Sequence, residues 1–229
     1  MILDRDQLLE VPGILAGSLS ASLVAELPAE TPPAPWHSNI EMTAWGFRAT
    51  AASARGLDAG LIPSLAAGGA AFISYLDGAV GPYREILASP RGVRVPGLRG
   101  IHGHVPFIAV DSLPSVHGGR ANWALPKIAA EFQGAPTRDA HLNAAGAGWQ
   151  LRAEVRCLGP WVPFRGAGSC AQPWPEGTVR AFVSRFRGRA RLALVEVGVD
   201  GPQELTALLP GGRHLGLVFR GAVDVGAPA

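Results

Sequence analysis

Hydrophobic and polar residues alternate over short stretches of this chain, a pattern typical of β-strands. Six segments mix β-branched, aromatic and apolar residues and are separated by turns that contain Gly or Pro. The predicted strands are residues 40–50, 70–76, 104–111, 149–156, 190–199 and 214–225. Two further segments, residues 58–65 and 124–132, have a more helical composition, the second because Ala and Glu follow Pro126.

Short strands that outnumber helices predict a mainly β or α+β fold with an antiparallel sheet. The regular alternation of strands and helices that builds a parallel sheet is absent from the sequence. A length of 229 residues is within reach of one β-barrel or sandwich domain, and no segment has the composition of a linker. We therefore expect one domain over residues 1–229.

Charge and hydropathy argue against several classes of protein. The formal net charge is +2 and the basic residues are mostly scattered, so nucleic acid is not an expected partner. Residues 1–10 are too acidic for a signal peptide, which predicts a cytoplasmic protein. Residues 59–76 are uncharged, but Pro63 and several glycines interrupt them, so a turn and a buried strand are expected and no membrane partner. The arginines that alternate over residues 185–191 predict a solvated strand face rather than an anion-binding stripe.

The cysteines and histidines do not form a recognisable metal or redox motif. Cys157 and Cys170 match neither pattern, so we expect reduced structural thiols. His102 and His104 lie two residues apart and would need His117 as a third metal ligand. No carboxylate pattern completes such a site, so the histidines are interpreted as strand or pocket residues, and neither a metal nor a cofactor is expected.

A single lysine is the most informative feature of the composition. Of the 20 Lys and Arg residues, only Lys127 is a lysine. Lys and Arg exchange almost freely at the surface, but only lysine can release its proton at accessible cost and form an imine. The uncharged neighbours from Trp123 to Ile128 predict a lowered pKa through desolvation. Lys127 is therefore a candidate nucleophile, the alternative being an ordinary helix ion pair with Glu131.

Two motifs resemble those of the acetoacetate decarboxylase family. The run DSLPSVHGGRANWALPK, residues 111–127, is similar to a family segment in which a Gly-Arg pair precedes the Pro-Lys pair holding a Schiff-base lysine. The upstream segment GPYRE, residues 81–85, resembles the family's Gly-x-Tyr-x-Glu, whose glutamate faces the active site. The motifs stand in the family's order, and the resemblance covers about residues 30–130. It implies a β-barrel of the acetoacetate decarboxylase type and a homo-oligomer.

The resemblance also implies roles for individual residues. Lys127 corresponds to the imine nucleophile and Glu85 to the acid–base group. Either Asn39 or His37 lies nearest to the place where the family has a carboxylate-binding arginine. The candidate substrate-binding residues are Arg120, Tyr83, Trp123, Asn39 and His37.

The sequence departs from the family at three positions. Decarboxylating members have a second lysine directly after the nucleophile, where this chain has Ile128. No arginine lies between Arg5 and Arg48, and a family glutamate is replaced by Ile73 or Ser74. These departures argue against acetoacetate as the substrate, but they leave imine chemistry possible.

Two classes of function fit these features. The first is a Schiff-base lyase acting on a small keto acid, either by decarboxylation or by aldolase-dehydratase chemistry, with Glu85 moving the proton. Burial or an arginine such as Arg120 would then have to activate Lys127. The second is a non-catalytic small-molecule-binding β-barrel, whose pocket would be lined by Trp36, Trp45, Tyr83 and Trp123.

Overall fold

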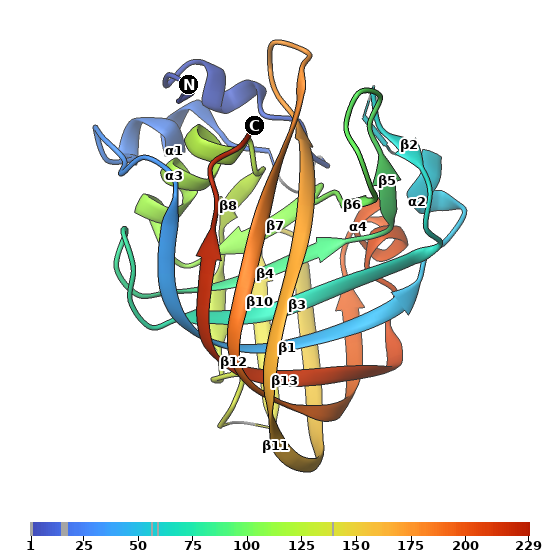
Figure 1. Ribbon diagram of the computed structural model, residues 1–229. Coiled ribbons are helices and arrows are strands. Elements are labelled where there is room, and N and C mark those ends of the chain that lie inside the picture. Colours follow the sequence, from blue (N-terminus) through green and yellow to red (C-terminus); the bar gives the residue numbers. More distant parts are fainter. Residues whose placement is uncertain (1, 15–17, 56, 59, 139) are drawn as a thin grey trace.

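Strands make up most of the fold and the helices are short (Figure 1). The computed structural model describes all residues except 1, 15–17, 56, 59 and 139. The helical elements are η1 (Gln7–Glu10), α1 (Ala21–Glu26), α2 (Ala52–Arg55), α3 (Leu113–Trp123) and α4 (Gln203–Leu208). The strands are β1 (Trp36–Arg48), β2 (Ile62–Pro63), β3 (Ala67–Tyr75), β4 (Tyr83–Ser89), β5 (Gly92–Arg94), β6 (His102–Gly103), β7 (Phe107–Val110), β8 (Lys127–Ala129), β9 (Glu131–Gln133), β10 (His141–Gly146), β11 (Trp149–Pro173), β12 (Val179–Asp200) and β13 (Gly212–Val225). The predicted mainly β class is confirmed.

All of these strands belong to one sheet of 13 strands. Its hydrogen-bonded order is β2-β5-β6-β11-β12-β13-β1-β3-β4-β7-β8, with β10 and β9 branching from β11. Most neighbours are antiparallel, as predicted, but β6 pairs with β11 and β7 with β8 in parallel. Among the described strands the path does not close on itself, so the barrel implied by the resemblance is an open, strongly curved sheet.

Each of the six predicted strands overlaps a strand of the structure, but both helix predictions are wrong. Residues 58–65 contain β2, with residue 59 outside the described part of the chain. Residues 124–132 contain β8 and most of β9. The long helix is α3, just before this segment. Its two internal glycines, Gly118 and Gly119, are poor helix formers, and they hid the helix from an interpretation based on propensity.

Local signals do explain where α3 begins and ends. Ser112 caps its start by accepting a hydrogen bond from the N–H of Ser115, and Pro114 occupies the first turn, where a proline is tolerated. Ala124 ends the helix in the left-handed conformation, with φ of 50°. The chain then turns directly into β8.

The uncharged stretch over residues 59–76 holds β2 and β3, in agreement with the expected turn and buried strand, apart from residue 59. No helix in the described part of the chain has the length and apolar character needed to cross a membrane. Arg185, Arg187 and Arg189 are exposed along β12, which confirms the solvated strand face for these three residues. The two cysteines are free thiols, as predicted.

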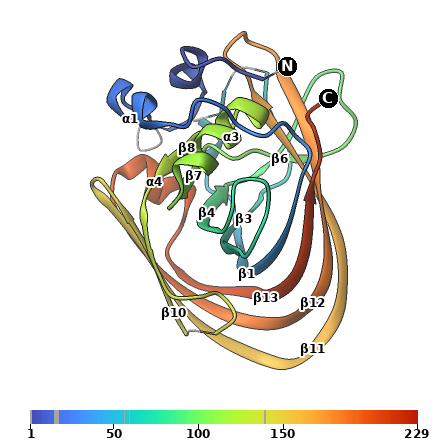
Figure 2. The ribbon, with the colours of Figure 1, turned by 90° about the vertical axis from the view of Figure 1, so that its left-hand side faces the viewer.

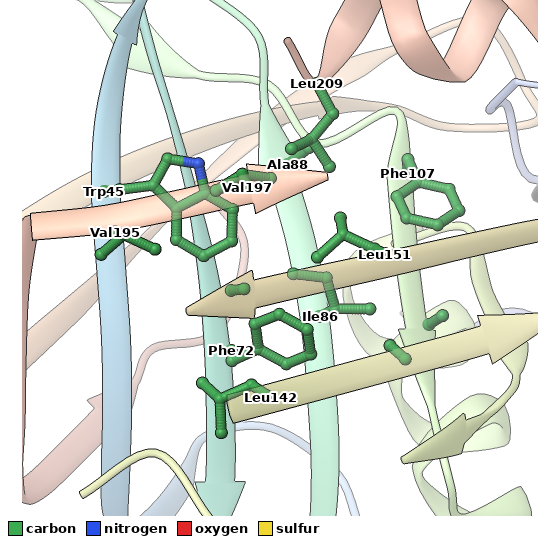
Figure 3. Packing of buried hydrophobic residues seen from close by; sticks show 14 of the residues in the cluster. Trp45, Phe72, Ile86, Ala88, Phe107, Leu142, Leu151, Val195, Val197 and Leu209 are labelled. Atoms are coloured by element: carbon green, nitrogen blue, oxygen red, sulfur yellow. The ribbon is translucent and has the colours of Figure 1, made fainter. Parts of the chain in front are cut away.

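The main hydrophobic core lies between two halves of the curved sheet (Figure 3). One half, formed by β1, β3, β4 and β7, contributes Trp45, Phe72, Ile86 and Phe107. The other half, formed by β10 to β13, contributes Leu142, Leu151, Val195 and Val197. Leu205 and Leu209, on and directly after α4, pack into the same cluster.

The long strands β11, β12 and β13 run side by side and curve around the molecule (Figure 2). Gly188 of β12 faces Gly221 of β13, where the two backbones approach closely. A Cβ atom on Gly188 would overlap the carbonyl oxygen of Arg220, and one on Gly221 would overlap that of Arg187. Glycine is therefore required at this pair for the strands to stay in register.

Replacing Gly188 with Ala should lower the free energy of unfolding by about 1–3 kcal/mol, because the added methyl group has no space against the β13 backbone. Chemical denaturation of both proteins measures this difference. Gly198→Ala is the matched control, since Gly198 lies on the same strand with no atom within 4 Å of its Cβ position. Equal stability of Gly188→Ala and Gly198→Ala would show that the strands can separate at this pair without cost.

Candidate active site

Strand β4 separates the main core from a cavity of about 250 Å³. Side chains alternate along the strand, so Ile86 and Ala88 enter the core while Tyr83, Glu85 and Leu87 line the cavity. The same alternation on β12 brings Phe182, Ser184 and Phe186 to the cavity wall. The remaining lining residues are Trp36, Ser38, Tyr75, Ser89, Gly103, Val105, Ile108, Trp123, Leu125, Lys127, Gly168, Ser169, Cys170 and Val225.

Lys127 reaches this cavity through the tight turn between α3 and β8. The N–H of Ala124 donates to the carbonyl oxygen of Arg120, and the N–H of Leu125 donates to that of Gly119. These bonds close the helix and let the chain turn into β8, which runs parallel to β7 with Lys127 beside Ile108. The side chain of Lys127 is buried, with 3% of its residue surface exposed.

The lysine side chain lies along α3, on the helix face formed by Gly119 and Ser115. A Cβ atom on Gly119 would overlap Cδ and Cε of Lys127, so the helix must lack a side chain at this position. Ser115, one turn earlier on the same face, accepts a hydrogen bond from Nζ at 3.0 Å. The adjacent Gly118 leaves space for the ring of Trp36 in the same way. The glycine pair therefore shapes the wall on which Lys127 and Trp36 rest.

The amine of Lys127 forms a buried ion pair with Glu85. Nζ donates to Oε2 of Glu85 at 2.6 Å, and Glu85 is 2% exposed. The hydroxyl of Tyr75 donates to the other carboxylate oxygen at 3.2 Å. The ring of Tyr83 lies 5.0 Å from Nζ and stacks on Tyr75 at 4.2 Å. Burial raises the pKa of both tyrosines, so their hydroxyls keep their protons at neutral pH.

The predicted lowering of the Lys127 pKa is wrong. Burial is the largest single influence on this pKa and lowers it, but the charge of Glu85, with contributions from Tyr83, outweighs burial. The net pKa of Lys127 is therefore raised. The sequence neighbours of Lys127 gave no sign of Glu85, which lies 42 positions away. A neutral amine still forms when the ammonium passes its proton to Glu85, and burial reduces the cost of this transfer because it penalises both charges of the pair.

Arg120 is buried beneath the site and does not line the cavity. Its Nε donates to the carbonyl oxygen of Lys127, and its Nη1 donates to that of Leu8, both at 2.8 Å. Burial lowers the pKa of Arg120 to about 9. Arg120 thus fastens the backbone of the lysine to the N-terminal segment, and this placement gives no support to the expected contact with substrate.

His37 and Asn39 lie on the outer face of β1. Nδ1 of His37 lies 2.7 Å from a carboxylate oxygen of Asp224, and the side-chain amide of Asn39 donates to Asp77 at 2.7 Å. Neither residue lines the cavity, because alternation along the strand brings the intervening Ser38 there instead. The structure therefore does not bring the two expected carboxylate-binding candidates to the site.

Three of the four aromatic residues expected in a pocket do line the cavity. Trp36 and Trp123 form an edge-to-face pair with ring centroids 4.8 Å apart, and Tyr83 lies beside Lys127. Trp45 is the exception, because it packs in the main core with its ring centroid 6.2 Å from that of Phe72.

The sequence interpretation missed Ser115 and Tyr75, both of which contact the ion pair. A signal for Tyr75 existed, since the chain has only two tyrosines and both lie at this site. The scarcity that made Lys127 conspicuous therefore applied to tyrosine as well. Ser115 carried no such signal, because a serine near the start of a helix is ordinary.

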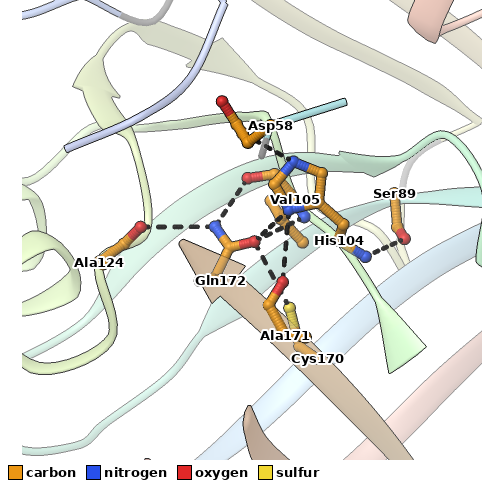
Figure 4. Close-up of polar contacts among 8 residues, drawn as sticks. All are labelled: Asp58, Ser89, His104, Val105, Ala124, Cys170, Ala171 and Gln172. Atoms are coloured by element: carbon orange, nitrogen blue, oxygen red, sulfur yellow. Dashed lines mark hydrogen bonds and ion pairs between the residues drawn. The ribbon is translucent and has the colours of Figure 1, made fainter. Parts of the chain in front are cut away.

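A polar network behind the cavity joins β11 to the turn that carries Lys127 (Figure 4). The amide nitrogen of Gln172 donates to the carbonyl oxygens of Val105 at 2.9 Å and Ala124 at 3.4 Å. Its amide oxygen accepts from the N–H of Val105 at 3.0 Å and lies 2.7 Å from Nδ1 of His104. Gln172 thereby holds the left-handed residue that ends α3.

The three histidines considered and rejected as metal ligands do not converge on one site in the structure. His104 also lies 3.4 Å from a carboxylate oxygen of Asp58, and Nδ1 of His102 lies 2.7 Å from the hydroxyl of Ser169. His117 lies near Arg5, and desolvation lowers its pKa. Within the described residues, no group of three or more His, Cys, Asp or Glu side chains is placed to hold a metal ion.

Comparisons with known proteins identify the fold. No protein-family model matches the sequence, and no curated protein matches it. Solved structures do match: the enduracididine biosynthesis enzyme MppR in complex with pyruvate has a TM-score of 0.60 and 17% identity, covering 88% of this chain and 91% of that one. Acetoacetate decarboxylase from Legionella pneumophila has a TM-score of 0.57 and 15% identity, covering 88% and 91%. An acetoacetate decarboxylase-like enzyme from Sphingomonas wittichii has a TM-score of 0.57 and 15% identity, covering 87% and 93%.

Replacing Glu85 with Gln should lower the pKa of Lys127 below the ordinary lysine value. The carboxylate that raises this pKa is removed, whereas the burial that lowers it stays. The chain has one lysine, so NMR of protein made with isotope-labelled lysine reports the side-chain nitrogen of Lys127 alone. Tyr75→Phe is the control, because it removes a hydrogen bond to Glu85 but keeps the charge, and the Lys127 pKa should stay raised.

The sign of the effect on stability follows from the same shift. Because the folded-state pKa of Lys127 in the wild-type protein is raised, the ion pair stabilises the fold below the unfolded-state pKa of about 10.4. This stabilisation is lost as the pH rises through the folded-state pKa.

An unchanged Lys127 titration in Glu85→Gln would contradict the assignment of Glu85 as the dominant charged partner.

Proposed function

We propose that this protein, which has the fold of acetoacetate decarboxylase-like enzymes, is a lyase that forms a Schiff base between Lys127 and the carbonyl group of a small substrate. One observation carries the proposal. The only lysine of the chain is buried in the wall of a cavity, with its amine 2.6 Å from the carboxylate of Glu85. Burying two charges costs free energy, and a pair of apolar residues at these two positions would avoid that cost. The buried pair is therefore better explained by a chemical role than by stability.

The ion pair supplies the groups that imine formation needs. Glu85 takes a proton from the ammonium of Lys127, and the neutral amine adds to the substrate carbonyl carbon. A second proton then moves from the nitrogen to the former carbonyl oxygen. The resulting carbinolamine loses water when the carboxylic acid of Glu85 returns the proton to the departing hydroxyl group. Ser115, at 3.0 Å from Nζ, hydrogen-bonds the nitrogen through these steps.

The protonated imine then acts as an electron sink for breaking a carbon–carbon bond. The bond between the α carbon and the departing carbon breaks, and its electron pair forms the double bond of an enamine between the α carbon and the former imine carbon. The enamine then takes a proton at the α carbon. Hydrolysis consumes one water, matching the water released on condensation, and frees Lys127. Tyr75 holds the carboxyl group of Glu85 by its second oxygen, so that the proton donor stays beside the nitrogen.

The comparisons support this class of chemistry. MppR has been seen with pyruvate, and also with the condensation product of pyruvate and imidazole 4-carboxaldehyde. Other structures of the same fold are described as acetoacetate decarboxylases. Decarboxylation and aldolase-dehydratase chemistry share the imine and the enamine, and the proposal covers both. The keto acid expected from the sequence combines the carbonyl group that this mechanism requires with a carboxylate.

A second candidate function is supported by the raised pKa of Lys127. The charge of Glu85 raises the pKa of Lys127 and so favours its ammonium form, and the cavity is lined by Trp36, Tyr83 and Trp123. A non-catalytic protein that binds an apolar small molecule would have the same features. The homo-oligomer and the cytoplasmic location inferred from the sequence stay predictions.

Reductive trapping should attach one substrate molecule to Lys127. Incubation with a carbonyl compound and cyanoborohydride should add a single mass increment, and peptide mapping should place it on Lys127, since the chain has no other lysine. Lys127→Arg keeps the charge but has no condensable amine, so the adduct should disappear.

The double variant Lys127→Met, Glu85→Gln guards against misfolding, because it removes both buried charges together and leaves neither unpaired. Circular dichroism should report a folded protein for at least one of the two variants. An adduct that survives in both, or that maps only to the N-terminal amine, would favour the binding-protein alternative.

Glu85→Gln should separate imine formation from proton transfer. In deuterium oxide and without reductant, the wild-type protein should exchange the hydrogens next to the carbonyl group of a ketone that binds reversibly, because this exchange requires the enamine. When cyanoborohydride is present, the variant should still form a covalent adduct between Lys127 and the ketone. Without the reductant, its hydrogen exchange should be slower than that of the wild-type protein by roughly 10²–10⁴-fold, the usual contribution of a positioned acid–base group. Glu131→Gln makes the same change at an exposed carboxylate that does not line the cavity, so it is the matched control and should exchange normally. A full exchange rate in Glu85→Gln would remove Glu85 from the mechanism.

A further inference from the structure

The charges of the cavity cancel within one ion pair. Among the described residues that line the cavity, Glu85 and Lys127 are the charged ones, and they bind each other at 2.6 Å. Forming the imine keeps this balance, because a protonated imine replaces the ammonium opposite Glu85. The cavity therefore holds no net charge in either state.

The arginines closest to the cavity in sequence face away from it. Arg84 follows the cavity residue Tyr83, but alternation along β4 points it to Asp111, where Nε donates at 2.7 Å. Arg185 lies between two lining residues of β12 and is exposed on the opposite face. Arg120 donates to backbone carbonyl oxygens beneath the site. None of these three cations lines the cavity.

A substrate carboxylate would therefore enter the cavity without a counter-charge. Lys127 is already neutralised by Glu85, so a bound keto acid would give the site a net charge of about −1. An unpaired buried carboxylate is strongly disfavoured, and the cavity wall offers it neutral hydroxyl groups but no cation besides the paired Lys127. The cavity thus selects against the carboxylate half of a keto acid.

The rest of the lining suits an apolar group with neutral polar atoms. Trp36, Trp123 and Phe182 form an aromatic cluster at the wall. An apolar cavity of about 150 Å³ is enough to bind benzene. The volume of about 250 Å³ therefore has room for a ring that carries a short carbonyl chain. The polar lining is mainly neutral hydroxyl groups, from Ser38, Ser89, Ser169 and Ser184.

We infer that the substrate of this site is a neutral aldehyde or ketone with an apolar, ring-sized group, and that a keto acid is disfavoured. This inference rests on the Schiff-base function proposed above and narrows its substrate class. A substrate without a carboxylate cannot lose carbon dioxide, so the carbon–carbon step is of the aldol type. In the cleavage direction, Glu85 takes the hydroxyl proton of a β-hydroxy ketone bound as its imine. The bond between the α and β carbons then breaks, an aldehyde leaves, and the electron pair forms the enamine.

The inference is tested with pairs of carbonyl compounds that differ only in the carboxylate. Phenylacetone and phenylpyruvate share the ring and the carbonyl group, but a methyl group in the first replaces the carboxylate of the second. Each is incubated with the protein and cyanoborohydride, and labelling of Lys127 is followed by mass. The rates are divided by those for Nα-acetyl-lysine under the same conditions, which corrects for the greater intrinsic reactivity of keto acids. Phenylacetone should label about 10²-fold faster than phenylpyruvate on this corrected scale.

A pair of variants at Ser184 provides a matched control. Ser184 lines the cavity from β12, so Ser184→Arg adds a cation to the wall, whereas Ser184→Gln adds similar bulk without charge. Ser184→Arg should shift the preference toward phenylpyruvate by about 10-fold or more relative to Ser184→Gln, because the new charge can pair with the carboxylate.

The outcomes separate the substrate class from the proposed function. If phenylpyruvate labels wild-type Lys127 as fast as phenylacetone, the neutral-substrate inference is wrong and the Schiff-base function stands. If neither these compounds nor the smaller pair of acetone and pyruvate labels Lys127, the Schiff-base function fails and the inference falls with it.

Discussion

The buried ion pair between Lys127 and Glu85 is the constraint on which the rest of the site depends. Its two partners come from β8 and β4, which flank β7 and are held in register by it, with Glu85 beside Val110 and Lys127 beside Ile108. Taking both charges out of water costs free energy, which their mutual attraction offsets only when the remaining polar atoms also have partners. Tyr75 and Ser115 supply those partners. Such a pair is weak evidence for stability and better evidence for a functional site.

The neighbouring backbone is arranged to hold this pair. The lysine side chain needs a helix face without a Cβ atom, which Gly119 provides. The turn before Lys127 needs fixed anchors, which Arg120 provides from the N-terminal segment and Gln172 from β11. The far wall of the cavity comes from the long C-terminal strands, whose curvature brings β12 over the site. The fold therefore brings segments from most of the chain together around the ion pair of Lys127 and Glu85.

The sequence predicted the features that are set within short segments, but it missed those that depend on contacts between distant segments. Scarcity and motif context singled out Lys127 and Glu85, and the strand patterns gave the mainly β class. The predicted direction of the Lys127 pKa shift was wrong because the shift depends on Glu85, which lies 42 positions away in the sequence. His37 and Asn39 were misplaced because a shift of one residue along a strand reverses the face. The sheet was expected to close because the family resemblance implied a barrel, and the motifs behind that resemblance carry no information on how the long C-terminal strands end.

Two of the differences between this sequence and the motifs of the acetoacetate decarboxylase family, which it resembles, have one electrostatic explanation. Where that family has a second lysine, this chain has Ile128, which is 7% exposed and belongs to the main core on the opposite face of β8 from Lys127. Where the family binds a carboxylate with an arginine, β1 presents Ser38 to the cavity. A lysine activated by a neighbouring cation leaves a site with excess positive charge, which an anionic substrate can balance. A lysine paired with Glu85 leaves a neutral site, in which a second cation and a substrate anion would each be unpaired. The two differences therefore agree with each other, because each leaves the described lining of the cavity without a cation that could pair with a substrate anion.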